Sequence, residues 1–217
     1  ATFESYELKL EYGYERKLNR EEVIETILKN LEKDDIVVST TGVASRELFE
    51  LREKYSHGHE KDFLTVGGMG HACQIALGIS LFKKNRMIYC IDGDGALLMH
   101  MGSLAINANK ASGNFKHIVI NNCAHDSVGG QPTVGDKIDI SGLALSSGYI
   151  WAKKASDKAK INNLMREMRH INGPALLEVQ VKKGFRKDLG RPTLNPIENK
   201  NSFMEFLDDD SNRTFWQ

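Results

Sequence analysis

The sequence lacks several features that would define a protein class. Its 217 residues carry no net charge, with 29 Lys and Arg against 29 Asp and Glu, so it has no basic excess for contacts to nucleic-acid phosphates. No apolar run approaches the ~18 residues that a membrane-spanning helix needs. Residues 1–12 contain three glutamates and no apolar stretch, so we expect no signal peptide there.

Cysteine and proline are also scarce, with three of the first and four of the second. Cys73, Cys90 and Cys123 form no C-x-x-C pair, and the seven histidines form no H-E-x-x-H motif. We therefore expect reduced thiols in a cytoplasmic protein, with neither a disulfide framework nor a zinc site. A hydrophobic content of 41% with 27% charged residues is typical of a globular protein with a substantial core.

Strand-like and helix-like segments alternate along the chain. Short apolar runs typical of buried strands occur at residues 36–38, 63–66, 87–91, 117–120, 149–152 and 175–181. Helical patterns occur at residues 20–31, 45–53, 71–82, 96–109 and 157–171, and once more after residue 195. The alternation predicts a three-layer, doubly wound α/β fold, with about six mainly parallel strands and helices on both faces.

The chain divides into three predicted parts. Residues 1–18 form a lead-in, residues 19–184 the α/β domain, and residues 185–217 a C-terminal extension with a short helix. Asn19 and Glu22 have capping-box spacing at the start of the domain. The chain begins with Ala1 and not with methionine, which we interpret as the mark of a trimmed or cut chain.

Three glycine-rich or polar turns follow three of the predicted strands, at residues 67–70 (GGMG), 93–95 (GDG) and 121–122 (NN). The carboxyl ends of parallel strands share one edge of a sheet, where ligands bind. The 25 residues between Gly95 and Asn121 correspond to one helix and one strand, so Asp94 and Asn122 are expected to converge.

The GDG turn has the composition of a phosphate site. Gly93 and Gly95 let a phosphate approach the backbone, and the N–H groups of the following helix attract it. A carboxylate there would repel a bare phosphate unless a divalent metal lay between them, and Asp94 and asparagine offer the oxygen ligands that Mg²⁺ or Ca²⁺ prefers. The alternative is an ordinary turn, since Gly-Asp-Gly is common and Asn-Asn recurs at residues 162–163.

This spacing resembles the fingerprint of the thiamine-diphosphate-dependent enzymes, which include decarboxylases and acetolactate synthases. The resemblance implies that Asp94, Asn122 and the backbone carbonyl of Ala124 bind Mg²⁺. Thiamine diphosphate and Mg²⁺ are thus the expected cofactors.

The resemblance also implies a cradle for the organic cofactor. Gly93, Gly95 and Ala96 would lie against the diphosphate, the last two as N–H donors. Met69 would support the bent cofactor, and Gly67 would accept a hydrogen bond from the amino group of its pyrimidine. Core packing is the alternative role for Met69.

Longer stretches, at residues 67–72, 91–102, 122–132 and 186–192, look like phosphonopyruvate decarboxylases, and sulfopyruvate decarboxylases share the general pattern. The resemblance runs from about Asn19 to Leu207. It implies decarboxylation of a 2-oxo acid, phosphonopyruvate to phosphonoacetaldehyde and CO₂, with a sulfopyruvate decarboxylase as the alternative. A non-catalytic phosphate-binding α/β module is the alternative from another class.

In this family the cofactor lies between two similar domains, and the second one supplies an activating glutamate. The sequence contains only one such unit, so the resemblance implies a pyrimidine-binding domain or subunit as partner, within a homo- or hetero-oligomer. We expect the chain alone to be inactive.

Further candidates remain around the fingerprint. His125 is a candidate proton donor because imidazole side chains are suited to proton transfer near neutral pH, or else a loop residue that hydrogen-bonds locally. Arg46, Arg186 and Arg191 are candidates to bind a phosphonate, or else surface residues. Cys123 is interpreted as a small packing residue, because no base is paired with it.

Overall fold

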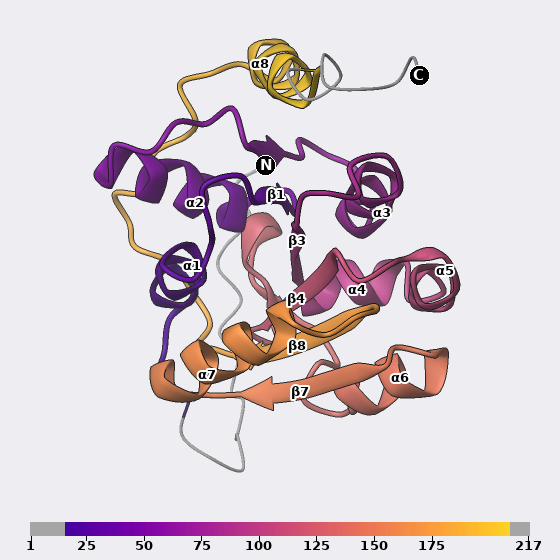
Figure 1. The fold of residues 1–217 in the computed structure, drawn as a ribbon. Coiled ribbons are helices and arrows are strands. Elements are labelled where there is room, and N and C mark those ends of the chain that lie inside the picture. Colours follow the sequence, from indigo (N-terminus) through magenta and orange to yellow (C-terminus); the bar gives the residue numbers. More distant parts are fainter. Residues whose placement is uncertain (1–15, 209–217) are drawn as a thin grey trace, which may run out of the picture.

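Six parallel strands form the central sheet in the order β2-β1-β3-β4-β8-β7 (Figure 1). They are β1 Ile36–Ser39, β2 Asp62–Leu64, β3 Ile88–Gly93, β4 Phe115–Asn121, β7 Trp151–Ala155 and β8 Ala175–Gln180. The computed structural model describes residues 16–208; most of the predicted lead-in and the end of the extension lie outside this range. The predicted doubly wound parallel sheet is confirmed.

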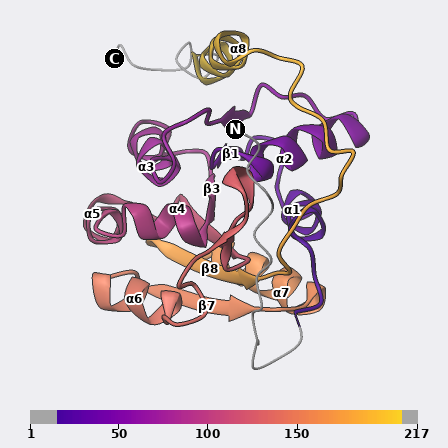
Figure 2. The same ribbon diagram turned by 180° about the vertical axis from the view of Figure 1, so that it is seen from behind.

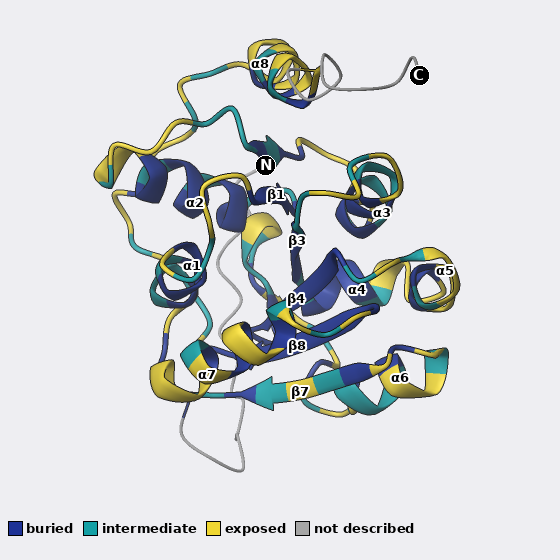
Figure 3. Cartoon of the chain, in the orientation of Figure 1, coloured by how far each residue is buried: buried dark blue, intermediate teal, exposed yellow. Residues whose placement is uncertain are grey.

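Helices cover both faces of the sheet (Figure 2). One core contains side chains of α1 Arg20–Leu28, α2 Val43–Lys54 and α7 Lys158–Arg169, and the other those of α3 Ala72–Phe82, α4 Asp94–Met99, α5 Ser103–Lys110 and α6 Ile140–Ser147. Strand residues alternate between the cores: Tyr89 and Ile91 belong to the first, Ile88 and Cys90 to the second. The inner strands are consequently buried on both faces (Figure 3).

The sheet reverses its direction of winding between β1 and β3. The chain passes from β1 outward to β2 and then returns to β3, on the other side of β1. The connections after β1 and β3 therefore diverge and leave a crevice at the carboxyl ends of these two strands. Doubly wound folds bind ligands at such a crevice.

The last helix, α8 Pro196–Asp208, covers the edge strand β2. The Asn199 side chain donates to the carbonyl of Asp62 at 2.9 Å and accepts from the N–H of Leu64 at 3.1 Å. Phe203 adds a ring contact to Phe63, with centroids 5.4 Å apart. One amide thus satisfies edge groups that would otherwise lack partners. No described helix combines the length and the apolar character needed to cross a membrane.

Three local predictions were wrong. The single helix expected at residues 96–109 is two helices, α4 and α5, because the backbone leaves helical geometry at His100 (φ −132°, ψ 44°). Helix α6 was not predicted, since its sequence ISGLALSS shows no clear apolar face. The connection after β4 contains a small hairpin, β5 Ala124–His125 with β6 Gln131–Pro132, joined by the 3₁₀ turn Asp126–Val128.

Candidate functional site

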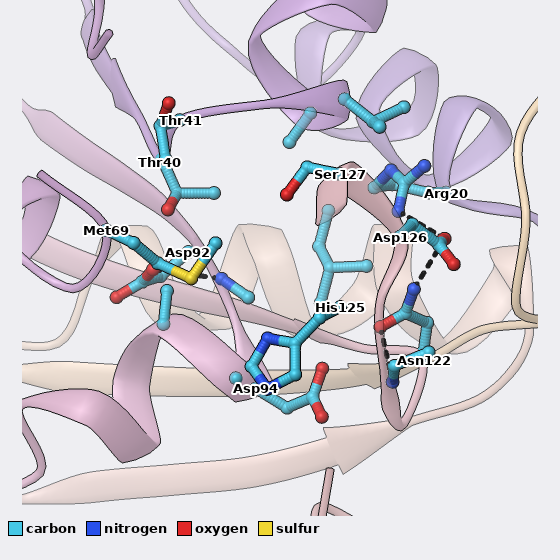
Figure 4. A pocket seen from close by; sticks show the side chains of 17 residues that line it. Arg20, Thr40, Thr41, Met69, Asp92, Asp94, Asn122, His125, Asp126 and Ser127 are labelled. Atoms are coloured by element: carbon cyan, nitrogen blue, oxygen red, sulfur yellow. Dashed lines mark hydrogen bonds and ion pairs between the residues drawn. The ribbon is translucent and has the colours of Figure 1, made fainter. Parts of the chain in front are cut away.

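The polar turns predicted to converge do so at the carboxyl edge of the sheet. They line a pocket, here called the edge pocket, with contributions from the ends of β3 and β4 and from the starts of α2 and α4 (Figure 4). Eight predicted residues line it: Met69, Gly93, Asp94, Gly95, Ala96, Asn122, Ala124 and His125. Its enclosed volume is about 60 Å³, so this chain forms one wall of a site and no chamber for a whole cofactor.

Gly67 is the predicted residue that the edge pocket leaves out. It is exposed, with a φ of +72°, and borders a neighbouring hollow together with Phe63 and His71. Its N–H donates to the Thr41 hydroxyl at 3.1 Å. The turn at residues 67–70 therefore brings Met69 to the pocket while Gly67 lies outside it.

Two glycines make the close approach of these turns possible. A Cβ on Gly70, whose φ is +87°, would stand 2.8 Å from the carbonyl oxygen of Ala96. A Cβ on Gly95 would stand 2.4 Å from Cε1 of His125. The GGMG turn thus packs on the first turn of α4, and the His125 imidazole lies over the GDG turn.

Asp94 is a buried carboxylate, 1% exposed, which forms no ion pair with any cationic residue in the described part of the chain. Burial raises its pKa to about 6, against the opposing effect of hydrogen bonds from the Thr133 hydroxyl and from the backbone N–H groups of Asn122 and Gly95. An unpaired buried carboxylate is costly, and a divalent cation would relieve that cost.

Asn122 is held with its amide in one orientation (Figure 4). Its Nδ2 donates to Asp126 at 2.7 Å, and its Oδ1 accepts the N–H of Ala124 at 3.2 Å. Asp126 also accepts from Arg20 at 3.1 Å and from the N–H of Gly184 at 3.0 Å. With the nitrogen committed to Asp126, Oδ1 is the atom of Asn122 that a cation can use.

Asn121, by contrast, holds the loop in place. Its Nδ2 donates to the carbonyl of Gly135 at 2.7 Å and to Glu178 at 2.9 Å, and its Oδ1 accepts the N–H of Cys123 at 3.2 Å. Cys123 is fully buried, as the packing interpretation predicts, and burial raises its thiol pKa to about 11. The thiol is consequently a poor nucleophile at neutral pH.

The groups that converge on the edge pocket fit a hard divalent cation and a phosphate. The Asp94 carboxylate, the Asn122 amide and the carbonyl at Ala124 are all oxygen donors, the type that Mg²⁺ prefers. Gly95 and Ala96, in the first turn of α4, add N–H groups of the kind that bind phosphate.

The central part of the chain, residues 41–179, matches the family model "Thiamine pyrophosphate enzyme, C-terminal TPP binding domain". The chain belongs to the thiamine pyrophosphate enzyme family. Thiamine pyrophosphate is another name for thiamine diphosphate, and the match includes every predicted residue of the edge pocket.

The relatives include two kinds of decarboxylase. The chain is 35% identical over 184 residues to a phosphonopyruvate decarboxylase of Streptomyces viridochromogenes, covering 85% of this chain and 45% of that protein. It is 34% identical over 167 residues to a sulfopyruvate decarboxylase subunit beta of Methanothermobacter thermautotrophicus, covering 77% and 84% respectively. The chain thus spans about half the length of the phosphonopyruvate decarboxylases that it matches.

Solved structures of thiamine-diphosphate-dependent enzymes share the fold. A benzoylformate decarboxylase from Polynucleobacter necessarius superposes with a TM-score of 0.65 at 16% identity, over 81% of this chain and 36% of that one. An enzyme from Mycobacterium smegmatis, described as a thiamin diphosphate-dependent enzyme, gives 0.63 at 20%, over 76% and 32%. At these identities the likeness establishes the fold alone.

Several residues around the edge pocket carried no recognisable sequence signal. Arg20 begins a helix more than a hundred positions before Asp126, and its guanidinium also binds Glu47 at 2.8 Å. Gly135 lies against Asp94: a Cβ there would approach the carboxylate to 2.6 Å. The high glycine content of the loop after β4 was the one sequence feature that indicated a close contact there.

Proposed function

We propose that this chain is the diphosphate- and Mg²⁺-binding part of a thiamine-diphosphate-dependent decarboxylase that converts phosphonopyruvate to phosphonoacetaldehyde and CO₂. The observation that carries the proposal is the buried Asp94 carboxylate. It has no cationic partner among residues 16–208, and it lies in the edge pocket beside Asn122, whose amide is held in one orientation. The names of two relatives support the substrate. Sulfopyruvate is the alternative, supported by the beta subunits.

In this proposal Asp94, Oδ1 of Asn122 and the carbonyl of Ala124 hold Mg²⁺. The N–H groups of Gly95 and Ala96 bind the diphosphate beside Gly93. Bound thiamine diphosphate supplies the electron sink that decarboxylation of a 2-oxo acid requires. The residues of this chain then act by binding and orientation.

Three further roles complete the proposed site. Met69 lies at the edge pocket and would support the bent cofactor by packing against it. His125 lies over Gly95, beside the proposed diphosphate position, and would hold or deliver a proton there. Gly67 would accept a hydrogen bond from the pyrimidine amino group, and its place outside the edge pocket fits a contact with the half of the cofactor farther from the metal.

The proposal includes a partner that covers the open side of the edge pocket. A pyrimidine-binding domain or subunit would supply the activating glutamate and complete an oligomer. The small enclosed volume supports this, as do the half-length match to the phosphonopyruvate decarboxylases and the match to proteins named as beta subunits. We also infer a cytoplasmic location, supported by three buried cysteines without a disulfide.

The test is CO₂ release from phosphonopyruvate and from sulfopyruvate, measured with the chain assembled with its pyrimidine-binding partner and with the chain alone. We expect faster release from phosphonopyruvate by the assembled enzyme and none by the chain alone. Release from neither substrate would reject the decarboxylase assignment. Robust turnover by the chain alone would reject the need for a partner.

A further inference from the structure

A second cavity of about 370 Å³, here called the arginine cavity, adjoins the edge pocket. It lies between the start of α2 and the C-terminal extension. Thr41, Val43, Asp126 and Ser127 line both spaces, so a molecule at the open side of the edge pocket has the arginine cavity beside it. The volume is that of a small-molecule site.

The lining of this cavity carries a positive charge. Arg46 and Arg191 are its basic residues, and Asp126 is its acidic residue. The Asp126 carboxylate is already bound by Arg20, Asn122 and the N–H of Gly184. The two cavity arginines therefore lack a neutralising carboxylate among the described residues.

Arg46 is held in place without being neutralised. It donates from Nε to the carbonyl of Gly190 at 2.5 Å and from Nη2 to the carbonyl of Leu189. Its guanidinium carbon lies 5.9 Å from the centroid of the Phe185 ring. Backbone carbonyls orient the group, and its full charge remains available to an anion.

Arg191 is exposed and forms neither a hydrogen bond nor an ion pair within the part of the chain that the structure describes. Arg186, the third arginine considered for the phosphonate, differs: it pairs with Glu21, Glu50 and Asp188 and does not line the cavity. Arg46 and Arg191 are thus available to bind an anion, whereas Arg186 is neutralised by its ion pairs.

The start of α2 adds to the positive field. Gly42, the N-cap of this 12-residue helix, provides no side-chain hydrogen bond to the first turn, and Gly42, Val43 and Ser45 line the cavity. The positive end of the helix dipole is therefore near the same space as the two arginines.

We propose that the arginine cavity binds the tetrahedral oxyanion carried by the substrate on the carbon next to its keto group, with Arg46 and Arg191 as anchors. Guanidinium groups bind phosphonate and sulfonate oxygens through paired, charge-assisted hydrogen bonds. The inference rests on the proposed function, because it assumes that the carboxylate and keto groups of the substrate lie at the open side of the edge pocket, next to the bound cofactor.

The test uses the assembled enzyme and an unreactive ligand, 3-phosphonopropionate, which has the phosphonate and carboxylate but no keto group. Arg191→Met is the main variant, since this side chain makes no contact that the fold needs. We expect the dissociation constant of 3-phosphonopropionate to be at least about tenfold higher for Arg191→Met than for the unmodified enzyme, as for the loss of one charge-assisted hydrogen bond. Arg166→Met is the matched control, because Arg166 is exposed on α7, and should bind like the unmodified enzyme.

Parallel titrations with 3-sulfopropionate and propionate distinguish the ligand classes. If Arg191→Met loses more affinity for 3-phosphonopropionate than for 3-sulfopropionate, the cavity is assigned to a phosphonate. The reverse result assigns it to a sulfonate. The affinity for propionate should not change. Equal affinities of Arg191→Met and the unmodified enzyme for both oxyanions would overturn the inference. Because binding is measured without turnover, absence of CO₂ release rejects the proposed function separately.

Discussion

Asn122 can present either end of its amide to a cation, and Asp126 selects the oxygen. The 2.7 Å bond from Nδ2 to Asp126 commits the nitrogen. A partner that orients a metal ligand typically accounts for a 10–100-fold effect on metal affinity. Asp126 acts as a positioning residue in this account, with no proposed contact to the metal.

We predict that Asp126→Asn weakens Mg²⁺ binding about tenfold, since the new amide can orient Asn122 less strictly. Arg20 keeps its bonds to Glu47, so the fold should survive. The measurement is the Mg²⁺ concentration needed for half-maximal cofactor binding, with Asp34→Asn as an exposed control. An unchanged Mg²⁺ requirement in Asp126→Asn would show that Asp126 does not position Asn122.

Residues that directly follow paired strands could be predicted from the sequence to lie close together. The spacing places Asp94 and Asn122 together because the 25 residues between Gly95 and Asn121 correspond to one helix and one strand, and the sheet pairs β3 with β4. Thr133 and Gly135, which also contact Asp94, lie on a loop with no regular path. Their contacts depend on Asn121, which donates hydrogen bonds both to the Gly135 carbonyl of that loop and to Glu178. The spacing of residues in the sequence does not predict these hydrogen bonds.

Among the elements, the break between α4 and α5 shows tertiary contact overriding helix propensity. The residues at 96–109 include one glycine and no proline, and they favour one helix. In the structure the GGMG turn packs on the Ala96 carbonyl, and the His71 and His100 rings lie 4.2 Å apart. The second helix starts only after Gly102. A sequence pattern alone does not reveal that another turn occupies this place.

For α8, we predict that Asn199→Ala lowers the free energy of unfolding by about 1–3 kcal/mol, the cost of leaving buried polar groups unpaired. The change would strip the Asp62 carbonyl and the Leu64 N–H of their partner. The matched control is Asn201→Ala on the same helix, where the side chain is exposed. Urea denaturation of both variants measures the difference. Equal midpoints for the two would refute the edge-pairing role.

At the scale of the whole molecule, the strand order explains why one short chain gathers so many polar groups at one edge. The winding reverses between β1 and β3, and the turns after these strands and after β4 face the same crevice. Alternation of strands and helices sufficed to predict this architecture. The adjoining arginine cavity was not predictable, because the extension that forms its wall returns from the far end of the chain.

We infer that this chain holds thiamine diphosphate through a divalent metal at Asp94. The direct test is calorimetric titration of thiamine diphosphate into the assembled enzyme, with Mg²⁺ and with EDTA, for the unmodified chain and for Asp94→Asn. Asp139→Asn, at an exposed position, is the control. We predict Mg²⁺-dependent binding that Asp94→Asn abolishes and Asp139→Asn retains. Binding of equal affinity in EDTA, or binding unaffected by Asp94→Asn, would contradict the claim.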